Sequence, residues 1–282
     1  MTADLSRAAR ETGEVLVVER LGGGLLELVA RLPHLAATAL PGTFAQLRCG
    51  QGTTPLLRRP FSIAWTQDDT CGFVFEAVGA GTRLLSELQP GDPLDSLGPL
   101  GHGFSVVDAG PVVCVSGGLG CAPFPLLINE LRRRGVEDIF VLNGARTATR
   151  LYPASRFARP ALPVVAEATD DGTRGHHGFV TDLLGQALSS HPSALYACGP
   201  NAMLGAVMRT LVDSGAELPP TLEASLEAPM GCGFGTCLGC ALPALDEAGS
   251  SVWRLCCTDG PVMAMRDVDW EGIGALPGAD VA

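Results

Sequence analysis

The sequence reads Met230-Gly-Cys-Gly-Phe-Gly-Thr-Cys-Leu-Gly-Cys240 in its C-terminal third, and a Cys256-Cys257 pair follows. The first three cysteines of this stretch form a C-x4-C-x2-C array. Such spacing is typical of plant-type [2Fe–2S] sites, in which one loop supplies three thiolates and a distant segment supplies the fourth. The four glycines favour the same interpretation, because glycine permits positive φ and a close approach of the backbone to inorganic sulfur. The pattern therefore predicts a centre that moves single electrons.

Other uses of these cysteines are weaker. Structural zinc usually takes two separated C-x2-4-C pairs and needs fewer glycines. A disulfide framework is disfavoured because no secretory signal is recognisable. The single cysteines Cys49, Cys71 and Cys114 lie in apolar or turn-like runs and are expected in the core. For the fourth ligand, Cys256 and Cys257 both remain open; neighbours in a strand point to opposite faces, so only one is expected to bind metal.

Composition limits the class of protein. The chain has 282 residues, of which 46% are hydrophobic and 17% charged, so two or three small domains can form. Its net charge of −11 argues against nucleic-acid binding, which needs a basic surface. No apolar run approaches the roughly 18–20 residues that span a membrane. Clustered cysteines of this kind favour a cytoplasmic enzyme.

The chain divides by texture into four ranges. Residues 1–12 are polar and expected to be a flexible N-terminus. Short alternating runs broken by Gly and Pro predict an antiparallel β-barrel over 13–108. Apolar strands alternating with helices predict a doubly wound α/β domain with a parallel sheet over 109–218. The remaining range, 219–282, is expected to be a small domain around the cysteines.

Two glycine turns in the α/β range have nucleotide-binding chemistry. Gly117-Gly-Leu-Gly120 joins an apolar strand to a helix, and Cys198-Gly-Pro200 follows a later strand. Free N–H groups at a helix start suit a pyrophosphate, and ligands of doubly wound sheets bind at the carboxyl ends of strands. Neither turn matches G-x-G-x-x-G, so each signal alone is weak.

Two motifs in the barrel range point to a flavin nucleotide. Arg59-Pro-Phe-Ser62 offers a guanidinium that can bind a phosphate in bidentate fashion and a hydroxyl that can meet a flavin ring. Gly81-Thr82 begins a predicted helix and could hold a phosphate or serve only as an N-cap. If the motif Arg59-Pro-Phe-Ser62 stood alone, an ordinary surface arginine before a strand would be the favoured interpretation of Arg59.

The order of these motifs resembles the ferredoxin–NADP reductase superfamily. The segment from Glu227 to Cys240, followed by Cys257-Thr-Asp-Gly-Pro-Val262, is similar to the electron-transfer subunits of two-subunit, NAD-dependent dihydroorotate dehydrogenases. The resemblance covers about residues 13–270. It implies an FAD-binding barrel, an NAD-binding α/β domain and a small C-terminal [2Fe–2S] domain.

The resemblance also implies a partner and a pathway. An FMN-containing catalytic subunit would oxidise dihydroorotate in pyrimidine (UMP) biosynthesis, in a heterotetramer with two copies of each chain. Electrons would pass through [2Fe–2S] and FAD to NAD+. This order is physically reasonable, because a flavin exchanges both hydride pairs and single electrons. Phe234 and Leu238 are expected to face the partner.

Site residues follow from the resemblance position by position. The family leaves one residue between its last cluster ligand and the Asp-Gly-Pro turn, which favours Cys257. No catalytic side chain is implied. FAD contacts would be Arg59, Pro60, Phe61, Ser62, Val74, Phe75, Glu76, Gly81 and Thr82; NAD contacts Gly117, Gly118, Gly120, Cys198, Gly199 and Pro200; cluster ligands Cys232, Cys237, Cys240 and Cys257.

Two other functions remain open from the sequence. Similar modules serve as flavin and iron–sulfur NAD(P)H reductase subunits of hydrogenase, sulfide dehydrogenase or transhydrogenase complexes. A non-enzymatic alternative is a cluster-bearing redox sensor or a zinc-stabilised binding protein. NAD is favoured over NADP because Asp170 and Asp171 lie beside Arg174, the nearest candidate for a 2′-phosphate contact.

Overall fold

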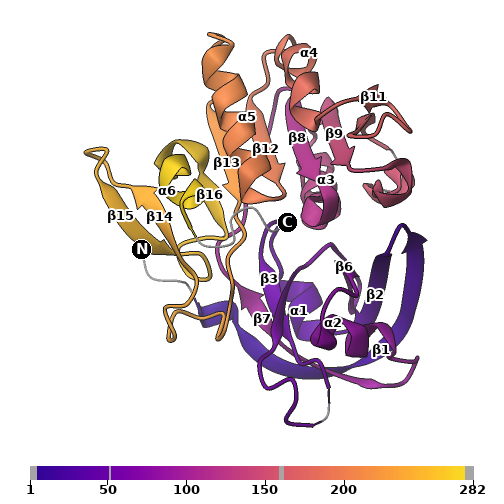
Figure 1. Ribbon diagram of the computed structural model, residues 1–282. Helices are drawn as coiled ribbons and strands as arrows, with labels where there is room; N and C mark the ends of the chain where they lie inside the picture. The colour runs from indigo at the N-terminus through magenta and orange to yellow at the C-terminus, as the bar shows by residue number, and fades with distance from the viewer. Residues whose placement is uncertain (1–4, 51, 159–161, 277–282) are drawn as a thin grey trace.

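The computed structural model describes residues 5–50, 52–158 and 162–276 (Figure 1). Its N-terminal part is a seven-stranded antiparallel sheet, in the order β4-β3-β7-β1-β2-β6-β5, that curves into a half-barrel. The elements of this part are β1 Ala9–Gly22, β2 Leu25–Arg31, α1 Pro33–Thr38, β3 Phe44–Leu47, β4 Arg59–Ser62, β5 Trp65–Gln67, β6 Thr70–Glu76, α2 Ala80–Ser86 and β7 Pro93–Leu100.

The two edges of the half-barrel meet where β4 passes into β5. The chain leaves β4 at Ile63 and Ala64, both fully buried, and enters β5 at Trp65. The N–H of Ile63 donates to Thr43 beside β3, and the N–H of Ala64 donates to Gly72 on β6. This switch from one edge strand to the other bends the sheet around its apolar core.

Strand β1 begins at Ala9, within the range expected to be a flexible N-terminus. Residues 9–12 pair with β7, from Ala9 opposite Gly98 to Thr12 opposite Asp95. The polar side chains of this segment have specific partners, which periodicity alone does not reveal. The Glu11 carboxylate accepts hydrogen bonds from the N–H groups of His34 and Leu35 in the first turn of α1.

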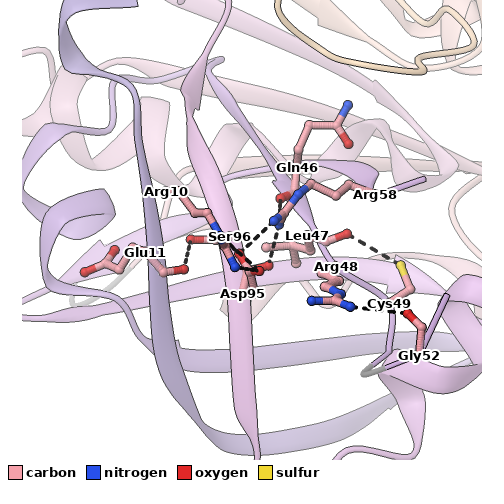
Figure 2. Close-up of polar contacts among 10 residues, drawn as sticks. All are labelled: Arg10, Glu11, Gln46, Leu47, Arg48, Cys49, Gly52, Arg58, Asp95 and Ser96. Carbon is pink, nitrogen blue, oxygen red and sulfur yellow. Dashed lines mark hydrogen bonds and ion pairs between the residues drawn. The ribbon is translucent and has the colours of Figure 1, made fainter. Parts of the chain in front are cut away.

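A charged network fixes β3 against β7 (Figure 2). The Asp95 carboxylate pairs with Arg10 at 2.9 Å and with Arg58 at 2.8 Å. Burial opposes ionisation of Asp95, but the hydrogen bonds from the two arginines outweigh it and lower the pKa of this carboxyl. The Arg58 guanidinium also donates to the backbone carbonyls of Asp95 and Gln46. One side chain thus ties the loop before β4 to two strands.

The second sheet has the order β11-β10-β9-β8-β12-β13-β16, with β16 antiparallel and the others parallel. Helix α3 covers one face and helices α4 and α5 the other (Figure 1). The elements are β8 Val112–Gly117, α3 Phe124–Arg133, β9 Ile139–Ala145, β10 Val164–Thr169, β11 His176–His177, α4 Leu184–Leu188, β12 Ala194–Cys198, α5 Asn201–Asp213, β13 Thr221–Ser225 and β16 Val262–Ala264.

The central strand β8 explains the apolar runs of the sequence. Val113 and Val115 pack with Leu204 of α5, whereas Val112 and Cys114 pack with α3. A strand covered on both faces has no position for polar side chains, so its sequence does not alternate. The predicted doubly wound arrangement is what these two apolar cores require.

The C-terminal part consists of a hairpin, β14 Ala241–Leu245 and β15 Ser251–Leu255, and helix α6 Trp270–Gly274. Its buried residues Leu242 and Ile273 join the same apolar core as α5. Both β13 and β16 lie in the second sheet, so the α/β unit extends past the boundary expected at residue 219. In the described ranges, no helix is long and apolar enough to cross a membrane.

Candidate redox site

The cysteine-rich segment, residues 230–240, is called the cluster loop below. Its three thiols and that of Cys257 form two pairs, Cys240 with Cys257 and Cys232 with Cys237. The Sγ atoms of Cys240 and Cys257 lie 3.1 Å apart and are buried. Cys237 is exposed, and its backbone N–H lies 3.4 Å from the Sγ of partly buried Cys232. One pair is thus inside the molecule and the other near its surface.

Backbone amides point at these sulfurs. The N–H of Gly235 donates to Cys257 Sγ at 3.2 Å, and that of Cys257 lies 3.4 Å from Cys240 Sγ. Burial would raise the pKa of the Cys232 thiol, but hydrogen bonds from the N–H groups of Phe234 and Cys237, among others, lower it to about 7. A loop that stabilises thiolate in this way suits metal binding.

Tight wrapping needs unusual backbone angles. Gly233 and Gly235 have φ of +84° and +86°, as glycine in such a loop allows. Leu238 also has a positive φ, 59°, which is uncommon for leucine and is not predicted from the sequence. Its side chain is 63% exposed.

The two adjacent cysteines have different surroundings. Both follow β15 in a turn, not within a strand. Cys257 faces Cys240, whereas the Cys256 thiol donates to the Leu226 carbonyl at 3.4 Å and lies in the apolar core. Burial raises the pKa of Cys256 well above its usual value. Cys256 has the environment of a core residue.

The donor set matches that of a two-iron centre. All ten cysteines are free thiols. Among residues 5–50, 52–158 and 162–276, no three His, Cys, Asp or Glu side chains converge on one metal position. The four thiols, which lie in two pairs, match the four-cysteine ligand set of a [2Fe–2S] centre, in which each of the two irons takes two cysteines.

A cavity of about 520 Å³ lies where the half-barrel, the second sheet and the C-terminal part meet. Met230 of the cluster loop lines one part of it and Leu119 of the glycine turn another. Nine of the expected cofactor residues line it: Pro60, Phe61, Ser62, Val74, Phe75, Glu76, Thr82, Gly120 and Cys198. The other six, Arg59, Gly81, Gly117, Gly118, Gly199 and Pro200, are not among its lining residues.

The barrel residues outside the cavity have local roles. The Arg59 guanidinium donates to the carbonyls of Leu57 and Arg58. Thr82, although it lines the cavity, accepts a hydrogen bond from the N–H of Gly79 at 3.0 Å. The N-cap of α2 is therefore Gly79 and not the Gly81-Thr82 pair; Thr82 lies in the first turn and bonds back to the N-cap backbone.

The two glycine turns of the second sheet lie against each other. A Cβ at Gly120 would collide with the carbonyl oxygen of Cys198, and a Cβ at Gly117 would collide with Met203. Gly118 has a positive φ of 56° but open space around its missing Cβ. Cys121 is fully buried and packs in the core. The turns thus depend on close backbone packing at one edge of the sheet.

Sequence reasoning missed the segment that joins β13 to the cluster loop. Ser225, Leu226 and Glu227 line the cavity, and the Asn201 side chain bonds the backbone N–H and C=O of Glu227 at 3.2 and 2.8 Å. Desolvation by the surrounding protein raises the pKa of the Glu227 carboxyl, although the residue is exposed to solvent. A useful signal was available: this segment follows a parallel strand at the ligand-binding edge.

The candidate 2′-phosphate contact is already neutralised. Arg174 donates to the Glu167 carboxylate at 2.6 Å. The pairing agrees with the preference for NAD over NADP.

Residues 227–269 match the family model of the iron–sulfur cluster binding domain of dihydroorotate dehydrogenase B. The chain is 37% identical, over 243 residues, to the dihydroorotate dehydrogenase B (NAD(+)) electron transfer subunit of Desulforamulus reducens. The match covers 85% of this chain and 90% of that relative. The chain belongs to this family. The electron transfer subunit of Geobacillus thermodenitrificans is 39% identical over 236 residues, covering 81% of this chain and 86% of the relative.

Solved structures agree with this assignment. A chain from work on flavin-based electron bifurcation by an NADH-dependent reduced ferredoxin-NADP oxidoreductase superposes with a TM-score of 0.78, at 25% identity and 95% coverage of both chains. The ferredoxin NADP+ reductase of Neisseria gonorrhoeae with bound FAD and NADP superposes with a TM-score of 0.59, at 19% identity, over 74% of this chain and 93% of that one. The second likeness bears on the fold alone.

As a dihydroorotate dehydrogenase B electron transfer subunit, the chain is part of an oxidoreductase. The predicted fold class, function and cofactors (FAD, an iron–sulfur cluster and NAD) are confirmed by these similarities. The sensor and hydrogenase-type alternatives have no support among the relatives described above. An electron transfer subunit implies a catalytic partner subunit.

Proposed function

We propose that this chain carries electrons between an FMN-containing, dihydroorotate-oxidising partner subunit and NAD+, in a cytoplasmic assembly with two copies of each chain. One observation carries the proposal: four cysteine thiols stand in two pairs beside a cavity that reaches the glycine turn of the second sheet. Family membership supports the choice of partner and of NAD.

The residues divide the work as follows. Cys232 and Cys237 would bind one side of the cluster and Cys240 and Cys257 the other. When bound, FAD exchanges hydride with NAD(H) and single electrons with an iron–sulfur centre. The expected FAD contacts on β4 and β6 form a largely apolar wall of the cavity, to which Ser62 and Glu76 on these strands and Thr82 on α2 add polar groups. Phosphates would be held by Arg59 and Gly81, which lie beside each other, and by the turns at Gly117, Gly118, Gly199 and Pro200.

The first test is the composition and spectrum of the anaerobically purified chain. We expect about two irons and two sulfides per FAD, with visible absorbance that NADH bleaches. NADPH should bleach it more slowly, because Arg174 is engaged by Glu167. Zinc in place of iron, without flavin, would contradict the proposal.

A second test concerns the partner surface. Phe234 and Leu238 of the cluster loop are 39% and 63% exposed, beside the surface cysteine pair. Changing both to glutamate should weaken binding to the catalytic subunit at least about tenfold, since apolar interface anchors commonly contribute about 2 kcal/mol or more. Isothermal titration of the purified subunits measures the change.

The matched control is Val212→Glu on α5, which removes a similarly exposed apolar side chain, 57% exposed, from the second domain. It should leave the affinity unchanged. Iron content must match the unmodified chain in both variants. Equal affinity of the cluster-loop variant and the control would place the interface elsewhere.

A further inference from the structure

Gln46 on β3 is a buried polar side chain without a hydrogen-bond partner. It is 0% exposed, and in the described part of the chain neither its Nε2 nor its Oε1 has a partner. Buried amides are nearly always paired, because leaving one unpaired is costly. The fold tolerates this exception at one particular place.

The backbone of Gln46 is satisfied separately. Its partner on the neighbouring strand β4 is Pro60, which has no N–H. The Gln46 carbonyl therefore accepts a hydrogen bond from the Arg58 guanidinium at 3.3 Å. Figure 2 shows this bond, and it shows the side-chain amide extending away from the Arg58–Asp95 network. The amide is therefore not part of the charged network.

The amide lies against the cluster loop. A Cβ built at Gly233 would come within 2.6 Å of Gln46 Nε2 and 2.8 Å of its Cγ. The contact therefore falls between the ligand candidate Cys232 and Phe234. Phe44, two residues earlier and so on the same side of β3, lines the cavity expected to hold the flavin. Strand β3 thus presents Phe44 to the cavity and Gln46 to the cluster loop.

We propose that the Gln46 side-chain amide is a positioning residue that donates a hydrogen bond to a sulfur atom of the iron–sulfur centre. The inference rests on the proposed function, which places such a centre in the cluster loop. Sulfide and thiolate sulfurs are anionic acceptors, and the N–H groups of Gly235 and Cys237 in the loop and of Cys257 after β15 already point at sulfur. Gln46 adds a donor from outside the loop, at a point where no acceptor on the described part of the protein takes it.

The expected consequence is a higher reduction potential. Reduction adds negative charge to the centre, so a donor to sulfur stabilises the reduced state more than the oxidised state. Gln46 would then favour electron uptake by the centre without touching NAD(H).

The test is a redox titration of the loaded protein followed by electron paramagnetic resonance. Gln46→Leu should retain iron, sulfide and FAD but shift the midpoint of the cluster to a more negative value. At the midpoint of the unmodified protein, its reduced-to-oxidised ratio should fall about tenfold, equivalent to about 59 mV for one electron. The flavin midpoint should not move. Gln67→Leu, at an exposed position on β5, is the control and should shift neither.

An unchanged cluster midpoint in Gln46→Leu would overturn the proposal, as would a shift of the flavin alone. If that variant fails to bind iron, Gln46→Met replaces it. Pulsed resonance on the unmodified protein, with 15N in the glutamine side-chain amides, gives an independent measurement: a 15N coupling to the reduced cluster supports the proposal, and its absence refutes it. Iron and sulfide analysis of the unmodified protein tests the proposed function separately. If the unmodified protein contains no cluster, the proposed function and the Gln46 proposal are both refuted.

Discussion

Replacing Cys257 with serine is expected to remove the iron–sulfur centre, whereas the same replacement of its neighbour Cys256 should leave it in place. The Cys257 thiol lies 3.1 Å from Cys240 and accepts from the N–H of Gly235. The Cys256 thiol instead donates to the Leu226 carbonyl within the core. Serine is a poor ligand for iron, so iron per chain in Cys257→Ser should fall to about a tenth or less. Iron, sulfide and visible absorbance measure the effect.

The two variants control each other because they make the same chemical change one residue apart. Cys256→Ser should cost about 1 kcal/mol of folding free energy, from burying a hydroxyl in an apolar site with one acceptor. Urea denaturation of the iron-free proteins separates this cost from the loss of metal. Iron retained in Cys257→Ser and lost in Cys256→Ser would exchange the two assignments.

The second large effect is expected at Gly120. A methyl group there would collide with the carbonyl oxygen of Cys198, so Gly120→Ala must push apart the two turns expected to bind NAD. Overpacking of this kind costs about 1–3 kcal/mol. NADH affinity should fall at least about tenfold, since both turns contribute to one site. NADH titration followed by flavin absorbance measures the affinity.

Gly118→Ala in the same turn is the matched control. The position has open space but a φ of 56°, so alanine pays only the left-handed penalty of about 1–2 kcal/mol. It should keep the two turns together and lose less affinity than Gly120→Ala. An equal loss in both variants would mean that backbone conformation, and not the contact with Cys198, controls binding.

The sequence carried much of this architecture because several patterns have single physical solutions. The apolar run at Val112–Gly117 is typical of a strand covered on both faces, and a glycine turn after such a strand lies at the edge of the sheet where ligands bind. The C-x4-C-x2-C spacing indicated the cluster loop in the same way.

Other features depend on contacts between segments far apart in the sequence. Residues 9–12 look polar and loose, yet Glu11 caps α1 and the segment pairs with β7. Gln46 reads as an ordinary strand residue; only the approach of Gly233 shows where its amide points. Glu227 and Asn201 join the cavity through a contact across 26 residues. Local periodicity has no access to such pairings.

The pairing of β16 with β13 also bears on how the chain avoids aggregation. β13 would otherwise be an exposed edge, with unpaired N–H and C=O groups that could recruit another chain. β16 covers Glu223 to Ser225 of that edge, yet it lies beyond the cysteine-rich loop in the sequence. A ribosome therefore completes the nucleotide-binding sheet only after it has made all four candidate ligands. The strand that covers the exposed edge and the last of the four metal ligands are thus synthesised at nearly the same time.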